Sequence, residues 1–196
     1  MHYQNVAAGI FIDRPNRFIA HVEVEGKTET VHVKNTGRCK ELLIPGTKVF
    51  LEDFKERMGS RKLRYSLIAV EKKCRKDTDT DCGSILINMD SQAPNKIVGE
   101  WLASQGYSLI KPEYTYGDSR IDFYMEKGTD KYLLEVKGCT LESGGHCFFP
   151  DAPTERGVKH LHELIKAKEN GFNAAVLFLI QMEEAIDFSP NDMTHP

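Results

Sequence analysis

Hydrophobic and polar positions alternate in short runs through the first part of this chain. Period-2 alternation and short continuous apolar runs between turn residues are typical of β-strands. The runs are residues 7–12, 18–24, 30–33, 48–52 and 65–70. Gly, Pro or Asn stand between them, at residues 14–16, 25–27, 35–37 and 44–46. Five short strands with one helical turn at residues 38–43 predict a small barrel of the OB type.

The pattern becomes mixed near residue 85. We expect strands at residues 85–87, 114–116, 120–125 and 132–137, and an apolar central strand at 173–180. One helix starts at Pro94 and ends before Gly106, and a second starts after Asp151 or Thr154 and ends at Gly171. The expected packing residues are Ile97, Val98, Trp101 and Leu102 in the first helix and Val158, Leu161, Leu164 and Ile165 in the second.

These patterns divide the chain into two units. Residues 1–84 form the predicted all-β barrel, and residues 85–196 form a predicted α/β domain. The polar stretch Lys76–Asp81 precedes the boundary and reads as a loop or linker.

The tripeptide Glu135-Val136-Lys137 ends one of the predicted strands. Because strand side chains alternate, Glu135 and Lys137 share one face. Together with Asp122 they form the D…E-x-K pattern of restriction-type nucleases, in which two carboxylates hold Mg²⁺ and the lysine assists the attacking water. A strand with one solvated face would give the same tripeptide, so the motif alone does not decide.

Composition and charge indicate the kind of protein in which this motif occurs. No apolar stretch is long enough to span a membrane, and five cysteines without a C-x-x-C pair indicate reduced thiols, so we expect a cytoplasmic protein. The formal net charge of −3 is uneven, since basic residues exceed acidic ones in the first 90 residues and the reverse holds afterwards. Residues 55–76 are strongly basic and include Arg61, Lys62 and Arg64. Such a cluster either binds a polyanion or is a solvated loop.

Six segments resemble the sugar fermentation stimulation protein family of bacteria and archaea. They are Arg14–Phe18, His32–Arg38, Pro94–Lys96, Ser119–Phe123, Leu134–Lys137 and Phe149–Leu161. The resemblance implies an N-terminal OB-type barrel, a C-terminal PD-(D/E)xK nuclease-like α/β domain, DNA binding and a role in regulating sugar metabolism.

The resemblance also implies roles for individual residues. Asp122, Glu135 and Lys137 are the expected catalytic residues, with Glu100 of the first helix joining Asp122 and Glu135 as a ligand of Mg²⁺, or of Mn²⁺ in its place. The expected nucleic-acid contacts are Arg14, Arg17, Arg38, Arg61, Lys62, Arg64, Arg156, Lys159 and His160. A surface position for Glu100 and a helix-surface or capping role for His160 stay open.

Two functions of different classes follow. The chain is either a metal-dependent DNA endonuclease or a DNA-binding regulator whose nuclease-like core is vestigial. A single-strand carrier that uses the barrel alone has less support, because its aromatic candidates Phe11, Phe18, Phe50 and Tyr65 suit a core equally well. The DNA sequence, the strand state and a homodimer are left open.

Overall fold

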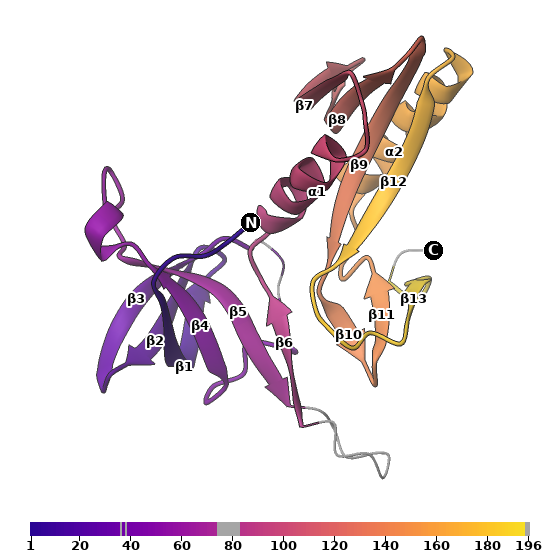
Figure 1. Ribbon diagram of the computed structural model, residues 1–196. Helices are drawn as coiled ribbons and strands as arrows, with labels where there is room; N and C mark the ends of the chain where they lie inside the picture. Colours follow the sequence, from indigo (N-terminus) through magenta and orange to yellow (C-terminus); the bar gives the residue numbers. More distant parts are fainter. Residues whose placement is uncertain (36, 38, 74–82, 195–196) are drawn as a thin grey trace.

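The computed structural model describes residues 1–35, 37, 39–73 and 83–194. Figure 1 shows a β-barrel at the lower left, an α/β unit at the upper right and a small sheet at the lower right. The expected contact residue Arg38 and the expected loop 76–81 lie outside the described residues.

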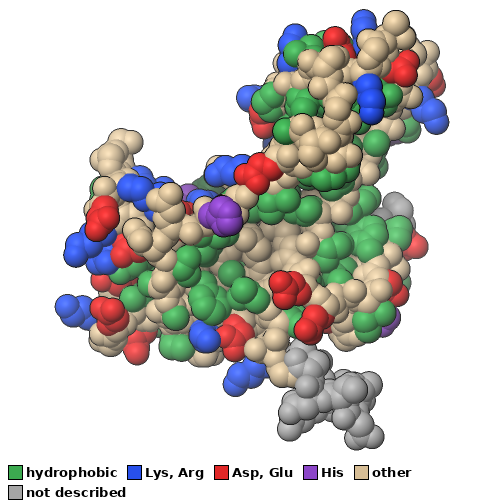
Figure 2. Space-filling view, viewed as in Figure 1, with side chains coloured by type: hydrophobic (Ala, Val, Ile, Leu, Met, Phe, Trp, Pro, Cys, Tyr) green, Lys and Arg blue, Asp and Glu red, His purple; other side chains and the backbone are tan. Residues whose placement is uncertain are grey.

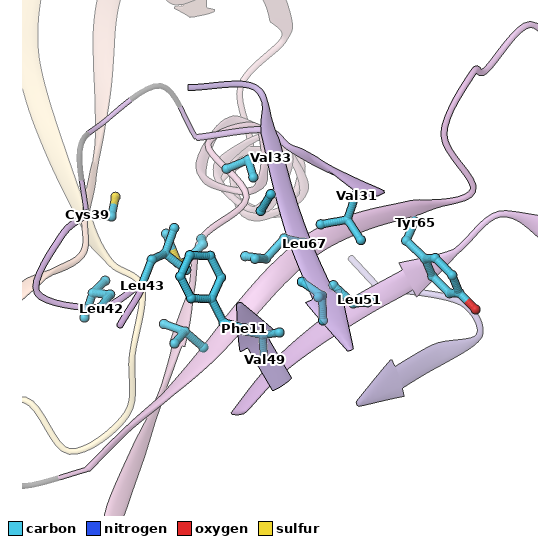
Figure 3. Close-up of a cluster of buried hydrophobic side chains, with 14 of the residues drawn as sticks. Phe11, Val31, Val33, Cys39, Leu42, Leu43, Val49, Leu51, Tyr65 and Leu67 are labelled. Carbon is cyan, nitrogen blue, oxygen red and sulfur yellow. The ribbon is translucent and has the colours of Figure 1, made fainter. Parts of the chain in front are cut away.

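The first unit is a closed barrel, as the strand pattern predicts. Its strands are β1 (Val6–Asn16), β2 (Ile19–Val24), β3 (Lys27–Val33), β4 (Lys48–Asp53), β5 (Tyr65–Lys73) and β6 (Ser84–Asn88), with a short 3₁₀ helix, η1 (Lys55–Arg57), after β4. The sheet order is β3-β2-β1-β4-β5-β6, and a parallel pairing of β3 with β5 closes the first five strands. Figure 3 shows Phe11, Val31, Leu51 and Leu67 among the side chains that fill the interior.

One detail of the barrel differs from the sequence prediction. Residues 85–87 were expected to open the α/β domain, but they lie in β6, which pairs with β5 and extends the barrel sheet to Asn88. Ile87 and Met89 pack into the barrel core, which explains why this strand joins it. The expected helical turn is present over the described residues 39–43 as a single turn, in which Leu43 N–H donates to the Cys39 carbonyl at 2.9 Å.

The second unit is a four-stranded sheet with a helix on each face. Its elements are α1 (Ala93–Ala103), β7 (Leu109–Tyr116), β8 (Ser119–Lys127), β9 (Asp130–Cys139), α2 (Glu155–Glu169) and β12 (Asn173–Ile180). The order is β12-β9-β8-β7, with β12 parallel to β9 and the other pairs antiparallel. Val98 and Leu102 of α1 pack against Phe123 and Val136, whereas Leu164 of α2 belongs to a separate cluster.

The strand at residues 173–180 was expected at the centre of its sheet and instead lies at an edge. Its apolar run has another origin, because both of its faces are partly covered. Val176 joins the α2 cluster, Leu177 joins the α1 cluster, and the Phe178 ring lies 5.2 Å from that of Phe149.

The predicted packing faces of both helices are partly wrong. In α1, Val98 and Leu102 are buried, but Ile97 and Trp101 are 39% and 48% exposed. In α2 the buried residues are His160, Glu163, Leu164 and Ala167, and of the expected face only Leu164 is among them. The helix therefore turns two ionisable side chains toward the sheet.

A small third sheet connects the two units. It contains β10 (Leu141–Ser143), β11 (His146–Phe149) and β13 (Asp187–Pro190), in the order β10-β11-β13. Lys72 of β5 forms an ion pair with Glu142 of β10, and the Gln181 side-chain amide donates to the Asn88 carbonyl at 3.0 Å. These polar contacts tie the barrel to the α/β unit. Within the described ranges, no helix is long and apolar enough to cross a membrane.

Candidate metal and phosphodiester site

Asp122 lies where strands β8 and β9 part. The ladder between the two strands ends at the pair Phe123 and Leu134. Beyond it, Asp122 Oδ2 accepts the Val136 N–H at 2.7 Å, so the side chain replaces the next backbone bond. Asp122 Oδ1 accepts from Asn95 Nδ2 of α1, also at 2.7 Å. The carboxylate is thereby fixed between a helix start and the splayed strands.

Glu135 stands on β9, on the side facing α2. Its side chain is only 3% exposed, and its Oε1 accepts from Lys137 Nζ and from His160 Nδ1, both at 2.5 Å. Lys137 shares the face because it is two residues further along the strand. An ionised carboxylate at this depth is stabilised by such charge-assisted donors.

Burial and a neighbouring negative charge both raise the pKa of Asp122. Burial raises the pKa of Asp122 above its ordinary value of 3.8, and the negative charge of Glu135 raises it further. The hydrogen bonds from Val136 and Asn95 and the charge of Lys137 lower this pKa only in part. Two carboxylates near one another favour a cation between them.

The donor set fits a hard divalent ion. Glu135 Oε2 is buried and has no hydrogen-bond partner, which is unusual for a carboxylate oxygen. Each oxygen of Asp122 accepts one bond and retains a further lone pair. Asp122 and Glu135 are therefore the residues that would hold Mg²⁺ or Mn²⁺, with water completing the shell.

Glu100 was expected as a third ligand, but the structure does not bring it to the site. Its side chain is 62% exposed and pairs with the amino group of Met1 at 2.5 Å. Among the described residues, no three His, Cys, Asp or Glu side chains are grouped to hold a metal. The helix residue that reaches the acidic pair is Asn95, near the start of α1. In the sequence, Pro94 and Asn95 indicated only the start of a helix. Nothing in the sequence therefore identified Asn95 as a residue that contacts Asp122.

The basic start of α2 is arranged around His160. His160 is buried against Glu135, and its Nε2 lies 3.5 Å from Arg156 Nε. Arg156 is exposed beside it, whereas Lys159 donates to the Asp118 carbonyl at 2.9 Å. The open alternative of a helix-surface or capping role for His160 does not match this burial. His160 is positioned to orient Glu135. Of Arg156, Lys159 and His160, Arg156 is the one that is exposed and whose side chain donates to no backbone carbonyl of a described residue.

The expected contacts Arg14 and Arg17 have different environments. The Arg14 guanidinium donates to the carbonyls of Gly37, Arg17 and Asn35 at 2.6–2.8 Å and so holds the loop after β3. Arg17 is exposed, with its guanidinium 4.8 Å from the centre of the Phe18 ring. Arg17 can reach a phosphate, while Arg14 is engaged in shaping the barrel.

The basic cluster after η1 is largely paired. Arg61 Nη2 donates to Ser66 Oγ at 2.6 Å, and its guanidinium lies 3.8 Å from the Phe54 ring centre. Arg64 holds the Asp53 carboxylate with two bonds, which lowers the pKa of Asp53. Lys62 is exposed. Figure 2 shows Lys and Arg side chains mixed with Asp and Glu at the outer edge of the barrel.

The buried cysteines near the site are inert thiols. Cys39, Cys139 and Cys147 are free and buried, and burial raises the pKa of Cys139 to about 12. Thiols with such a pKa stay protonated and neither bind metal nor attack a substrate. Cys74 and Cys82 lie outside the described residues.

The geometry defines a class of protein: an OB-type barrel fixed to an α/β domain that carries an acidic pair beside a lysine. Residues 12–78 match the family model described as the SfsA N-terminal OB domain, and residues 92–196 match the sugar fermentation stimulation protein RE domain. The chain belongs to the sugar fermentation stimulation protein family.

Relatives with the same description are similar along the whole chain. The homologue from Ruminiclostridium cellulolyticum is 51% identical, with 100% of this chain and 83% of the relative aligned. The homologue from Desulfitobacterium hafniense strain DCB-2 is 53% identical over 100% of this chain and 82% of its own length. A solved structure titled "The structure of Pyrococcus Furiosus SfsA in complex with Ca2+" superposes with a TM-score of 0.83 at 27% identity and covers 100% of this chain and 81% of that one.

Proposed function

We propose that this protein binds DNA and carries a phosphodiester-cleaving site that depends on a divalent metal, Mg²⁺ or Mn²⁺. The observation that carries the proposal is the Glu135 carboxylate, which is buried with one oxygen unpaired beside Asp122 and Lys137. An unpaired buried oxygen costs about 1–3 kcal/mol, so a fold that retains one has a use for it. The Ca²⁺ complex of the Pyrococcus furiosus relative supports a divalent ion in this fold.

The residues divide the chemistry between them. Asp122 and Glu135 would hold the ion, which when bound supplies Lewis-acid stabilisation of charge on the phosphate oxygens. Lys137 Nζ, next to Glu135 on the same face, holds the attacking water and offsets the charge that develops on the phosphate. His160 Nδ1 donates to Glu135 Oε1, the same oxygen that accepts from Lys137, which leaves Oε2 without a donor from the described residues.

DNA binding is supported by the exposed cations on both units. Lys62 and Arg17 lie on the barrel and Arg156 lies at the start of α2, so backbone contacts can extend from the barrel to the acidic pair. We place this activity in the cytoplasm, where the buried thiols stay reduced.

One observation favours the second candidate, a DNA-binding regulator of sugar metabolism genes without catalysis. Both oxygens of Asp122 accept hydrogen bonds, and Glu100 is not near enough to add a third carboxylate. A metal would have to share Asp122 with these two hydrogen bonds, which weakens its hold on the ion and favours binding of DNA without turnover.

The experiment uses labelled single-stranded and duplex DNA with Mg²⁺, Mn²⁺ or a chelator. The intact protein is expected to cut in the presence of metal, and Glu135→Ala and Lys137→Ala are expected to lose cutting while retaining DNA binding. Cutting that continues in the chelator, or no cutting of any substrate, would contradict the nuclease proposal. Salt-sensitive binding without cutting would favour the regulator.

A further inference from the structure

A cavity of about 300 Å³ lies between the barrel and the α/β unit, beside the residues that hold Asp122. Two of its lining residues, Asn95 and Val136, are the ones that donate to Asp122. The opposite wall includes Asn35 and Gly37, in the loop that Arg14 fixes through its backbone carbonyls. The cavity is therefore built by both units, and it shares Asn95 and Val136 with the surroundings of Asp122.

Its walls carry the groups that recognise a flat polar ring. Three side-chain amides line it, from Asn35, Asn95 and Gln181, together with the carboxylate residue Asp151. One end of each amide is held by the protein, since Asn35 Oδ1 accepts from Gly37 N–H, Asn95 Nδ2 donates to Asp122 and Gln181 Nε2 donates to the Asn88 carbonyl. The Asn35 amino group and the carbonyl oxygens of Asn95 and Gln181 are the ends left for a ligand. Phe148 also lines it and is only partly buried, and this ring makes no ring contact with another described aromatic side chain. Amide edges beside an aromatic surface are the means by which proteins read an unstacked base.

The same walls disfavour a phosphate. Within the described part of the chain, no Lys, Arg or His lines the cavity, and Asp151 is the one charged residue that does. A phosphate there would meet the Asp151 carboxylate, and no described side chain of the wall supplies a cation. The cation of the site, Lys137, lies instead beside Glu135. A phosphate is therefore favoured beside Lys137 and Glu135, and an uncharged ring is favoured in the cavity.

Close approaches fix the dimensions of the cavity. A Cβ added to Gly138 of β9 would lie 2.1 Å from Gln181 Oε1 and 2.8 Å from Pro94 Cγ, so a glycine is required for this wall. On the barrel side, a Cβ on Gly37 would lie 2.9 Å from Asp151 Oδ2. The volume is at the lower end of the roughly 300–1,000 Å³ that small-ligand sites occupy, which suits one base.

We propose that this cavity takes one unpaired nucleobase of the strand whose phosphate lies at Asp122 and Glu135. The inference rests on the proposed function and names its substrate class: DNA with an unpaired nucleotide beside the target phosphate, as a single strand or a flipped base. A base within a continuous duplex is stacked and paired on the edge that the amides would read, so it cannot enter.

The test measures binding separately from cutting. Short oligonucleotides with a single 2-aminopurine, either single-stranded or fully paired, are titrated into the intact protein in a chelator, where metal-dependent cutting is absent. We expect the fluorescence of the unpaired probe to change on binding and that of the paired probe to stay constant. Equal responses of both probes would overturn the inference.

Two variants test the walls. Phe148→Ala is expected to weaken binding of the unpaired probe about tenfold, and to leave binding of the duplex within about twofold, because base stacking on an aromatic ring is lost. Asp151→Asn, at an exposed position, is expected to weaken binding of probes with cytosine at the tested position about tenfold relative to thymine, since cytosine donates its amino group to a carboxylate. The matched control is Asp192→Asn, which is also exposed and does not line the cavity.

The outcomes separate this inference from the proposed function. A probe response that depends on Phe148 and Asp151 in a protein that cuts nothing supports the base site and overturns the nuclease. Metal-dependent cutting of duplex DNA at the same rate as single strands, with both variants unchanged from the Asp192→Asn control, overturns the base site and leaves the nuclease standing. Unfolding curves of Phe148→Ala are recorded, and if that variant does not fold, the cytosine preference of Asp151→Asn decides.

Discussion

Glu135 shows at the scale of one residue how the site departs from an ordinary protein interior. Its Oε1 receives two charged or polar donors, whereas its Oε2 receives none. A core that served only stability would divide the donors between the oxygens or replace the carboxylate by an apolar side chain. The uneven distribution leaves one oxygen directed at the place where a cation would lie.

His160→Ala is expected to weaken metal binding by roughly 10- to 100-fold, because the outer partner of a ligating carboxylate fixes its orientation. Calorimetric titration with Mn²⁺ measures this directly. His160→Asn retains an N–H donor near the position of Nδ1 and is expected to recover most of the affinity, which a merely structural role would not require. His162→Ala is the matched control, since His162 is exposed two residues further along α2. Equal affinities of His160→Ala and the intact protein would contradict the assigned role.

Asp122→Asn is expected to stabilise the protein at neutral pH in a chelator. The pKa of Asp122 is raised in the folded state, so the folded protein binds its proton more tightly than the unfolded chain does. The intact protein therefore loses stability as the pH rises from the ordinary value of 3.8 to the raised pKa, and the variant does not. Rotation of the Asn95 amide lets it accept from the new side chain.

Urea unfolding at a series of pH values measures this difference. The variant's advantage should grow with pH across that interval and be constant above it. An exposed carboxylate, removed by Asp192→Asn, serves as the control and should give no such trend. An advantage of Asp122→Asn that is independent of pH would show that the charge of Asp122 is not the cause.

At the scale of elements, the start of α2 determines where His160 lies. Thr154 is the N-cap, and its Oγ1 accepts the Gly157 N–H at 3.0 Å. Thr154→Ala is expected to lower the free energy of unfolding by about 1 kcal/mol, since one helix N–H loses its partner. Thermal unfolding measures the loss. Thr129→Ala, in the exposed turn between β8 and β9, should change stability much less, and equal losses would argue against a capping role.

Sequence patterns predicted most of the strands of this fold but not the buried face of its second helix. Short alternating or continuous apolar runs between turn residues predicted the barrel and the strands of the site. The barrel strands β2 and β3 each have one mainly buried face, whereas β5 and β9 are buried on both faces over several consecutive residues. The same reasoning did not predict which face of α2 is buried. A hydrophobic count places Leu161 and Ile165 inward, yet the helix turns His160 and Glu163 to the sheet.

Contacts that span long sequence separations were also beyond prediction. Asn95 meets Asp122 across 27 residues, and nothing in the sequence distinguishes this asparagine from one that starts a helix. Glu100 has the carboxylate that a metal ligand needs, but its position on α1 places that side chain at the exposed surface. The strands β10, β11 and β13 are too short for a periodic signal, and they form only because their partners are assembled around them.

At the scale of the whole molecule, the barrel and the α/β unit are held together by buried polar contacts. Lys34 and Asp90 form an ion pair at 2.8 Å in which the carboxylate is fully buried, and Asn88 N–H donates to the Gln181 carbonyl at 2.8 Å. Such directional contacts favour one relative placement more than apolar contacts of the same area do. The cavity beside Asp122 depends on that placement, because its two walls come from different units.

At this scale, some basic side chains are exposed with their charge unpaired, whereas others form contacts that support the fold. Arg64 is bound to Asp53 and Arg61 to Ser66, whereas Lys62 is exposed and forms no ion pair or hydrogen bond with another described residue. Of the three, Lys62 therefore has its full charge available for a phosphate. Arg64 would have to release a carboxylate first, so its contribution to binding is reduced by the loss of that pair.

Lys62→Ala is accordingly expected to weaken DNA binding and to reduce the slope of log Kd against log salt by about 1, with unchanged thermal stability. Arg64→Ala is expected to lower the thermal unfolding temperature slightly through the loss of the ion pair with Asp53, with a smaller effect on the slope. Fluorescence anisotropy at several salt concentrations measures the slope. Lys168→Ala, which removes one exposed charge at the far end of α2, is the matched control. If Lys62→Ala and the control share the slope of the intact protein, DNA does not contact Lys62, and Arg17 and Arg156 remain as the exposed cations proposed to bind it.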